Sequence, residues 1–198
     1  MREFRIAEPR TTEELAALLG ETAEPAVLMA GGTDLLDELK SGVEKAGLVV
    51  DLRNVEGLAG IAKEKDGLRI GAMTRIVDLA ADGMVAKDYP SLKEAALSLA
   101  TPQLRNVGTV GGNLCQRPRC WYYRGDFHCA RKGGDTCYAK EGENQLHAIF
   151  GGDVCVMVHP SDTAPALMAL DASVRLVGPG GARTVALDAF FVPPSKDH

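Results

Sequence analysis

The pattern of apolar and polar positions at the start of the chain predicts a strand followed by a capped helix. Residues 1–10 are expected to contain an edge strand that ends at Pro9. Thr11 is followed three residues later by Glu14, which is the pattern of a capping box. Leucines at helical spacing continue from there, and Gly20 is expected to stop the helix.

Two short apolar runs, 26–30 and 47–52, then predict buried strands with a helix between them. The first run leads directly into the glycine turn 31–34. Such a turn presents bare backbone N–H groups at the start of a helix, where they favour a phosphate, and glycine lets the phosphate come close. A simple strand-to-helix turn accounts for the pattern about equally well. The turn also lacks the G-x-G-x-x-G spacing of a Rossmann site.

A second lobe is expected to begin near Val55. A strand over 68–74 ends in a turn of small residues, from which Thr74 could cap a helix over 76–81. Pro90 suits the first turn of the next helix, whose apolar stripe we interpret as core.

The last part of the chain predicts one more buried strand, a helix and a hairpin. The strand is expected at 156–158, and Ser161 or Asp162 can cap the helix after it. The runs 173–177 and 183–187 are expected to pair as a hairpin, because a Gly-Pro-Gly-Gly turn joins them.

The composition is that of an ordinary globular protein, with 45% hydrophobic and 25% charged residues among 198. The formal net charge is −5 and no basic run stands out, so a surface for nucleic acid or an anionic membrane is not expected. No apolar stretch approaches the ~20 residues needed to span a bilayer, and the N-terminus lacks the apolar core of a signal peptide. We therefore expect a reducing compartment.

A second glycine-rich segment spans 106–113 and contains three glycines and two valines. It suits a tight backbone passage against a flat or charged ligand, and Thr101, Thr109 and Asn113 add short hydrogen-bonding side chains. The alternative is a loop whose glycines only supply positive φ angles. Asp162 is either a helix cap or a residue that binds the hydroxyls of a cofactor.

All five cysteines lie between residues 115 and 155, separated by 5, 9, 8 and 18 positions. None of these spacings is the C-x₂-C of a zinc finger or a ferredoxin. In a reducing compartment such a group indicates a metal or a cluster rather than disulfides, and four thiolates suit either zinc or a [4Fe–4S] cluster. Any single cysteine could instead be a small buried apolar residue. No Ser/His/Asp set or supported pair of carboxylates points to chemistry on a substrate.

Four segments, in the same order along the chain, resemble motifs of the FAD-binding subunit of the molybdenum hydroxylases. That family includes xanthine dehydrogenase, carbon monoxide dehydrogenase and aldehyde oxidoreductases. The segments are 30–36, 70–74, 104–113 and 159–162. The cysteine-rich stretch 120–155 resembles an insertion in the flavin subunits of 4-hydroxybenzoyl-CoA reductase and the periplasmic aldehyde oxidoreductase, where the loop binds an additional [4Fe–4S] cluster.

The resemblance implies an α+β fold of two lobes, of the p-cresol methylhydroxylase type, with FAD extended between the lobes and a cysteine-rich insertion. The turn 31–34 would hold the pyrophosphate, and Asp162 would bind sugar or ribityl hydroxyls. The full set of implied FAD contacts is Ala30, Gly31, Gly32, Thr33, Asp34, Leu35, Thr101, Gly108, Thr109, Gly111, Gly112, Asn113 and Asp162. By position, the [4Fe–4S] ligands would be Cys120, Cys129, Cys137 and Cys155, with Cys115 left out.

The resemblance also implies a domain organisation and partners. Residues 1–54 would form the first lobe, 55–190 the second lobe with the insertion at about 115–155, and 191–198 a linker to a further C-terminal domain. The chain would be an electron-transfer subunit, with a molybdenum-cofactor large subunit and a [2Fe–2S] small subunit as partners. The expected location is the cytoplasm, or the periplasm if a partner carries the protein across the membrane. The rivals are a self-contained flavin oxidase or reductase and a zinc-stapled binding module without flavin.

Overall fold

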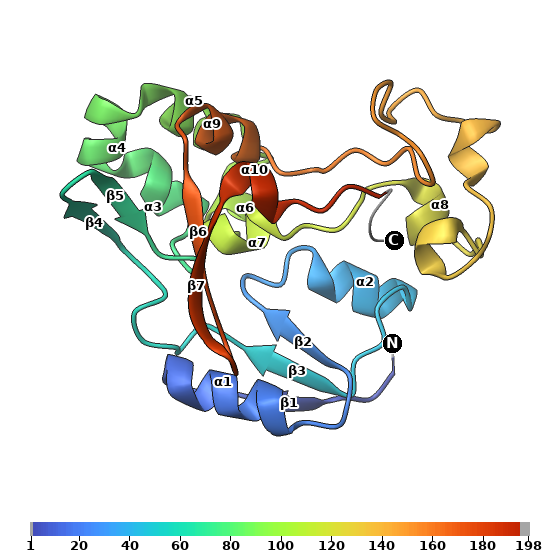
Figure 1. Ribbon diagram of the computed structural model, residues 1–198, viewed down its shortest axis with the longest axis horizontal. Coiled ribbons are helices and arrows are strands. Elements are labelled where there is room, and N and C mark those ends of the chain that lie inside the picture. Colours follow the sequence, from blue (N-terminus) through green and yellow to red (C-terminus); the bar gives the residue numbers. More distant parts are fainter. Residues whose placement is uncertain (1, 195–198) are drawn as a thin grey trace.

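The first lobe is built on a parallel three-stranded sheet. The structure is a computed structural model and describes residues 2–194. Strands β1 (Arg5–Ala7), β3 (Leu48–Asp51) and β2 (Ala26–Met29) lie side by side in that order, so β1 is the edge strand that the sequence predicts. Helices α1 (Thr12–Glu21) and α2 (Leu35–Ser41) lie on opposite sides of this sheet (Figure 1). All four residues of the central strand are buried.

Helix α1 begins as the capping box predicts, but it does not end where expected. Thr11 Oγ1 accepts from the N–H of Glu14 at 3.1 Å, and the Glu14 carboxylate accepts from the backbone just before the helix at 2.8 Å. The predicted stop at Gly20 is wrong, because the helix runs on to Glu21. A Cβ at Gly20 would lie 3.4 Å from the side chain of Pro179, an ordinary van der Waals distance, so Gly20 lies beside the turn that contains Pro179.

The second lobe opens with a hairpin and three short helices. These elements are β4 (Ile61–Glu64), β5 (Gly67–Ile70), α3 (Ile76–Ala81), α4 (Gly83–Asp88) and α5 (Pro90–Ser98). Pro90 is the first residue of α5, as predicted, because its fixed φ and missing N–H cost nothing there. The largest apolar cluster of the lobe contains Ile76, Leu79, Ala80, Val85, Leu92, Ala96, Leu99 and Val110.

Thr74 does not cap α3, contrary to the sequence-based prediction. Its hydroxyl accepts from the N–H of Gly60 and donates to the carbonyl oxygen of the same residue, both at 3.0 Å. The capping position of α3 is instead held by Arg75, whose side chain makes no cap hydrogen bond. The Thr74 hydroxyl therefore bonds to Gly60, 14 residues away in the chain, instead of capping the helix that follows it directly.

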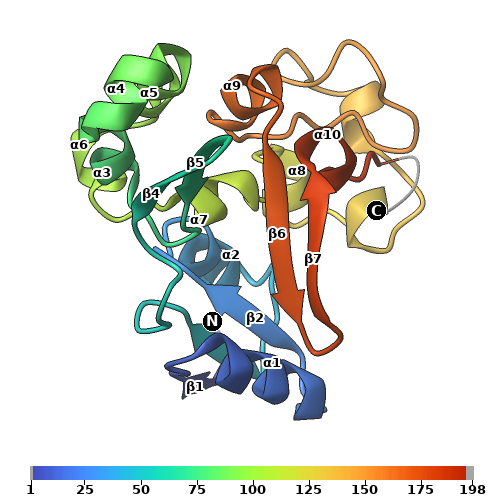
Figure 2. The same ribbon diagram turned by 60° about the vertical axis from the view of Figure 1, so that its left-hand side comes forward.

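The rest of the second lobe contains four short helices and a long hairpin. These elements are α6 (Pro102–Arg105), α7 (Val110–Leu114), α9 (Ala164–Ala169), β6 (Ser173–Gly178), β7 (Gly181–Ala186) and α10 (Leu187–Phe190). The hairpin is confirmed, with pairs from Ser173–Ala186 to Gly178–Gly181. Its turn reaches α1 of the first lobe, where Pro179 meets Gly20 (Figure 2). The hairpin therefore connects the two lobes.

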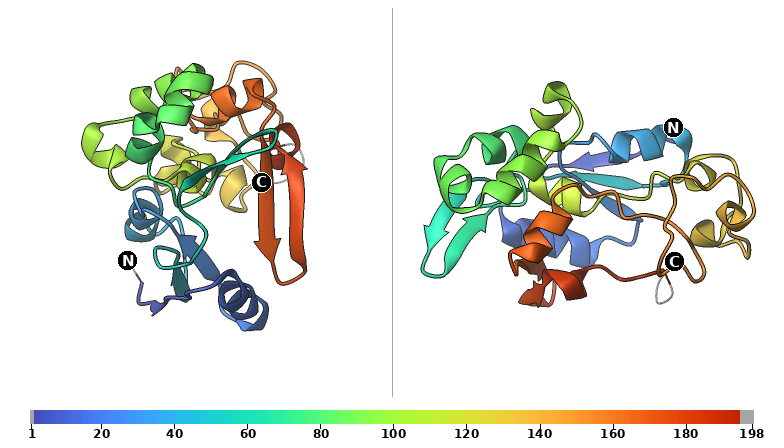
Figure 3. Two further views of the ribbon diagram at one scale, coloured as in Figure 1. Left: turned by 90° about the vertical axis from the view of Figure 1, so that its left-hand side faces the viewer. Right: turned by 90° about the horizontal axis from the view of Figure 1, so that it is seen from above.

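The cysteine-rich insertion, residues 115–155, stands at one end of the molecule beside α2 (Figures 1 and 3). Its regular pieces are α8 (Trp121–Arg124) and the 3₁₀ turns η1 (Ala130–Lys132) and η2 (Tyr138–Lys140). The strand predicted directly after it, at 156–158, is wrong. The carbonyl oxygen of Val156 accepts from the N–H of Ala148 at 2.9 Å, so this run closes the insertion instead of joining a sheet.

The predicted linker 191–198 lies partly outside the described residues. In the described part, the ring of Phe191 contacts that of His159, with centroids 4.4 Å apart. Within residues 2–194, none of the helices combines the length and apolarity required to cross a bilayer.

Candidate functional site

The two glycine-rich segments meet backbone to backbone at the start of α2. A Cβ at Gly31 would overlap the carbonyl oxygen of Val107, and one at Gly112 would lie 3.6 Å from the Cβ of Ala30. Gly32 has φ +73°, a left-handed conformation that side chains disfavour. Glycine is therefore needed at position 31 so that the two backbones can approach closely, and at position 32 so that the chain can take a left-handed conformation. The structure brings together two segments that lie more than 70 residues apart in the chain.

Free backbone donors lie at this junction. Within the described chain, the N–H groups of Gly32, Thr33 and Asp34 donate to no other residue. They precede the first turn of α2, where the N–H groups and the helix dipole both favour an anion. Thr33 is exposed and Gly32 is buried, so the turn has one face open to a ligand. This donor set fits a phosphate or a pyrophosphate.

The second glycine-rich segment forms helix caps rather than an open loop. Thr109 Oγ1 accepts from the N–H of Gly112 at 3.1 Å and caps α7. Thr101 caps α6 through the N–H of Leu104 at 3.4 Å. Thr109 is buried and Thr101 is exposed, so only the latter hydroxyl faces solvent.

Asn113 holds Asp162 in place through a buried hydrogen-bond network. The Oδ1 of Asn113 accepts from the Ser161 hydroxyl at 2.8 Å, from the Thr163 hydroxyl at 2.7 Å and from the Thr163 N–H at 3.1 Å. Its Nδ2 donates to Asp162 Oδ2 at 3.0 Å. Asp162 itself is exposed, so its carboxylate is oriented from one side and open on the other.

Ser161 and Thr163 are partners that the sequence analysis did not assign to the site. Both are buried, and Ser161 Oγ also accepts from the N–H of Ala164, the first residue of α9, at 3.0 Å. The N-cap position of α9 is Thr163 rather than Ser161 or Asp162, the two residues that the sequence analysis offered for it. The only signal in the sequence was their position on either side of Asp162.

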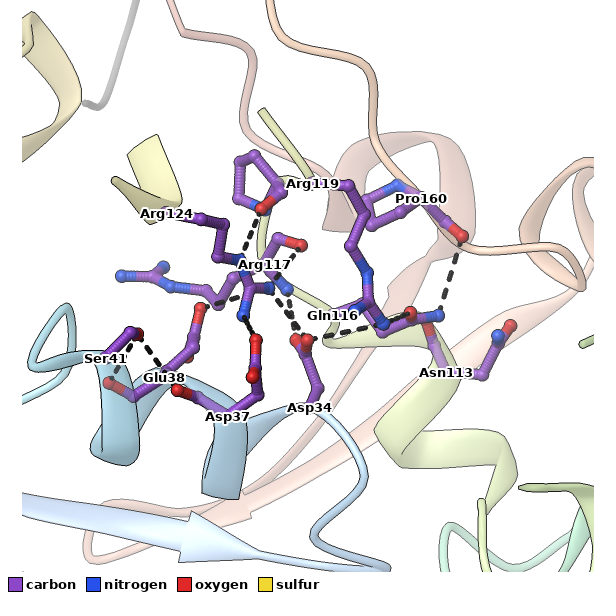
Figure 4. A network of polar contacts seen from close by, with 11 residues as sticks. Asp34, Asp37, Glu38, Ser41, Asn113, Gln116, Arg117, Arg119, Arg124 and Pro160 are labelled. Atoms are coloured by element: carbon purple, nitrogen blue, oxygen red, sulfur yellow. Dashed lines mark hydrogen bonds and ion pairs between the residues drawn. The ribbon is translucent and has the colours of Figure 1, made fainter. Parts of the chain in front are cut away.

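The carboxylate of Asp34 faces the insertion (Figure 4). Arg124 Nη2 approaches Asp34 Oδ1 at 2.7 Å, and the backbone N–H of Arg117 donates to Oδ2 at 2.9 Å. Arg119 Nη2 lies 3.3 Å from the same carboxylate. The Asp34 side chain is therefore occupied by the insertion, so that only its backbone N–H is left for the predicted contact.

Glu38 lies one turn further along α2, on the same side as Asp34. Its carboxylate is buried, and Arg124 Nη2 lies 3.3 Å from it. Burial raises the pKa of Glu38 to about 7, and Asp34 acts in the same direction, whereas Arg124 opposes them. The sequence analysis missed Glu38 and Arg124. Only the spacing of four between Asp34 and Glu38 could have indicated a shared helix face.

Four of the five cysteines surround one cavity in the insertion. Cys120, Cys129, Cys137 and Cys155 line it, together with aromatic side chains and Arg131. Cys115 is exposed and lies outside this lining. Burial raises the pKa of the Cys155 thiol, and the neighbouring Cys137 and Cys120 add to the shift. Over residues 2–194, no three His, Cys, Asp or Glu side chains form a group that could hold a metal ion.

Comparison with known proteins identifies the family. The sequence model described as "FAD binding domain in molybdopterin dehydrogenase" matches residues 2–198. The chain belongs to this family. It is 40% identical to the aldehyde oxidoreductase FAD-binding subunit PaoB of Escherichia coli K12, over 99% of this chain and 63% of that protein. It is 31% identical to the carbon monoxide dehydrogenase medium chain of Hydrogenophaga pseudoflava, over 96% of this chain and 52% of the relative.

The fold comparison agrees with the family assignment. Carbon monoxide dehydrogenase from Hydrogenophaga pseudoflava superposes with a TM-score of 0.70 at 30% identity, covering 96% of this chain and 53% of that one. The match confirms the predicted family resemblance and the α+β FAD-binding fold, and it supports FAD as the cofactor. The zinc-stapled module without flavin is therefore wrong. The chain spans between about half and two thirds of the length of these relatives.

Proposed function

We propose that this chain is the FAD-binding electron-transfer subunit of a molybdenum hydroxylase, of the aldehyde oxidoreductase, xanthine dehydrogenase or hydroxybenzoyl-CoA reductase type. The observation that carries the proposal is the junction of two glycine-rich backbones beside free N–H groups at the start of α2. A dinucleotide pyrophosphate needs donors of this kind and a backbone it can approach closely. When bound, FAD supplies the redox chemistry, while the protein sets its distance, burial and potential.

Each side of the junction would have its own task. The N–H groups of Gly32, Thr33 and Asp34 would bind the pyrophosphate. Asp162, oriented by Asn113, would accept hydrogen bonds from sugar or ribityl hydroxyls. The remaining residues of the predicted set would provide space and shape, since glycine has no side chain and the Thr109 hydroxyl already caps a helix.

We further propose that the insertion holds a [4Fe–4S] cluster on Cys120, Cys129, Cys137 and Cys155. The arrangement of all four thiols around one cavity, with Cys115 outside it, supports this ligand set. The four sulfur ligands of a cubane cluster lie further apart than the ligands of a single metal ion. Four cysteines around a cavity therefore suit a cluster even where they form no site for one ion. Aromatic side chains in the lining would limit solvent access and so influence the cluster potential.

The proposed partners follow from the relatives. The two relatives are named as an FAD-binding subunit and a medium chain, so each is one part of a larger enzyme. We expect substrate chemistry on a molybdenum-cofactor large subunit and a [2Fe–2S] small subunit as second partner, with this chain relaying electrons. The location, expected to be the cytoplasm or the periplasm with a partner, stays a prediction.

The test compares three proteins purified without oxygen: the natural chain, Cys129→Ser and Cys115→Ser. Flavin, iron, sulfide and zinc are measured on each, with a visible spectrum. We expect flavin bands in all three at saturating FAD, roughly four irons and four sulfides in the natural chain and in Cys115→Ser, and loss of iron in Cys129→Ser. Zinc in place of iron would refute the cluster, and absence of flavin from the natural chain would refute the flavin site.

A further inference from the structure

Arg124 joins the insertion to the proposed flavin turn, and the proposed function gives it no role. Its guanidinium is nearly buried, with 13% of the side chain exposed. Nη2 contacts Asp34 at 2.7 Å, and Nε donates to the carbonyl oxygen of Pro118 at 2.9 Å. The same group lies 3.3 Å from Glu38 and 3.5 Å from Asp37 (Figure 4). One side chain thus bridges the insertion and the first turns of α2.

The position of Arg124 in the insertion ties it to the cysteine cavity. It is the last residue of α8, and its N–H donates to the carbonyl oxygen of Cys120 at 2.9 Å. Cys120 lines the cavity. The guanidinium and one wall of the cavity therefore belong to the same helical turn. On the other side, Asp34 contributes one of the free N–H groups of the flavin turn, so the bridge ends directly at the proposed pyrophosphate site.

The charges explain why such a bridge is needed. The backbone N–H of Asp34 would bind an anionic phosphate, while the side chain of the same residue is a carboxylate. The carboxylate and the phosphate are both negative and would repel each other. Arg124 and the N–H of Arg117 occupy both carboxylate oxygens. Charge-assisted hydrogen bonds of this kind orient the carboxylate as well as stabilising its negative charge. They would hold the carboxylate away from the ligand side and leave the backbone donors free.

We propose that Arg124 is a positioning residue for the flavin turn, through which an ordered cysteine-rich insertion supports FAD binding. The proposal rests on the proposed FAD site. In this role Arg124 acts through Asp34, by neutralising and orienting its carboxylate, and not on the reacting atoms. Because coupling between two sites is reciprocal, FAD should in turn stabilise the ordered insertion.

The test measures the dissociation constant of FAD, by quenching of flavin fluorescence, in the whole chain with its insertion. We expect Arg124→Gln to weaken FAD binding roughly tenfold, since a hydrogen bond to a charged group is lost beside the site. Arg124→Lys keeps the positive charge but loses the planar set of guanidinium donors, so its affinity for FAD should be intermediate. Asp34→Asn added to Arg124→Gln removes the repelling carboxylate and should recover much of the affinity. As a control for loss of an arginine charge, Arg5→Gln removes an exposed ion pair with Glu24, 3.0 Å apart at the other end of the strands, and should leave FAD binding unchanged.

The outcomes separate this proposal from the flavin site itself. If the natural chain binds no FAD, the proposed site fails before Arg124 is in question. If the natural chain binds FAD and Arg124→Gln binds it equally well, the positioning role is refuted. A weakened Arg124→Gln that Asp34→Asn does not improve would give Arg124 a general folding role and would also refute the proposal. Iron content and melting temperature, measured on every variant, show whether the insertion itself is retained.

Discussion

At the scale of single residues, the buried carboxyl of Glu38 is the group in residues 2–194 whose ionisation the fold changes most. Its burial outweighs the attraction of Arg124, so its pKa is raised to about 7 from an ordinary value of 4.5. Arg124 and Arg117 lower this pKa, whereas Asp34 and Glu44 raise it. Between pH 4.5 and 7 the folded protein therefore binds more protons than the unfolded chain, and its stability falls as pH rises through that window.

Glu38→Gln should remove this pH dependence. Glutamine keeps an acceptor for Arg124 but carries no charge that burial penalises. We expect the variant to gain on the order of 2 kcal/mol in free energy of unfolding at pH 8 relative to the natural chain. The difference should be near zero at pH 4.5. Denaturant titrations at both pH values measure it, and a variant that loses stability at pH 8 would show that the ionised pair with Arg124 outweighs burial.

At the scale of elements, the β2–α2 turn and the loop before α7 depend on each other because their backbones touch. The contact leaves no room for a Cβ on Gly31, since the nearest atom is the carbonyl oxygen of Val107. A backbone atom cannot turn aside as a flexible side chain can. The two segments therefore form the flavin junction only with glycine at this position.

Gly31→Ala should consequently separate the two segments. We expect a loss of about 2 kcal/mol in free energy of unfolding from overpacking, together with weaker FAD binding. The matched control is Gly83→Ala at the start of α4, where an added Cβ meets no atom within 4 Å. That change should be neutral or slightly stabilising, because alanine restricts the unfolded chain. Equal effects of the two variants would contradict the junction.

At the scale of the whole molecule, the end of the insertion carries little apolar packing. The insertion holds short turns and loops, and three large apolar side chains near its end are mostly exposed: Leu146 by 73%, Ile149 by 86% and Phe150 by 85%. The lobes, in contrast, contain the apolar clusters and are connected by the β6–β7 hairpin. Local opening should begin in the insertion.

Brief digestion with chymotrypsin should therefore cut first near Leu146 and Phe150. Exposed loop segments are the preferred sites of nicking. The two fragments should stay associated through the lobes, and iron loading of the insertion should slow the cut. Mass spectrometry of the digest locates the first site. Initial cleavage within the lobes would contradict this order of stability.

The sequence by itself determined the features that depend on neighbouring residues. The capped start of α1, Pro90 at the start of α5 and the glycine turn of the β6–β7 hairpin were all predicted, because hydrogen bonds and backbone angles within a few residues specify them. The ordered set of motifs also indicated the family. The resemblance to that family implied four cysteine ligands, and the same four cysteines line the cavity, while their binding of a cluster stays a prediction.

Only the tertiary structure decided where side chains found partners far away in the chain. The Thr74 hydroxyl bonds to Gly60 instead of capping its helix, and the Asn113 side chain bonds to residues 48 to 50 positions later in the chain. Asp34 and Arg124 meet across 90 residues. A short-range pattern cannot indicate such contacts, because the same polar side chain satisfies a nearby cap or a distant partner equally well. Which of the two it binds depends on how the lobes and the insertion pack together.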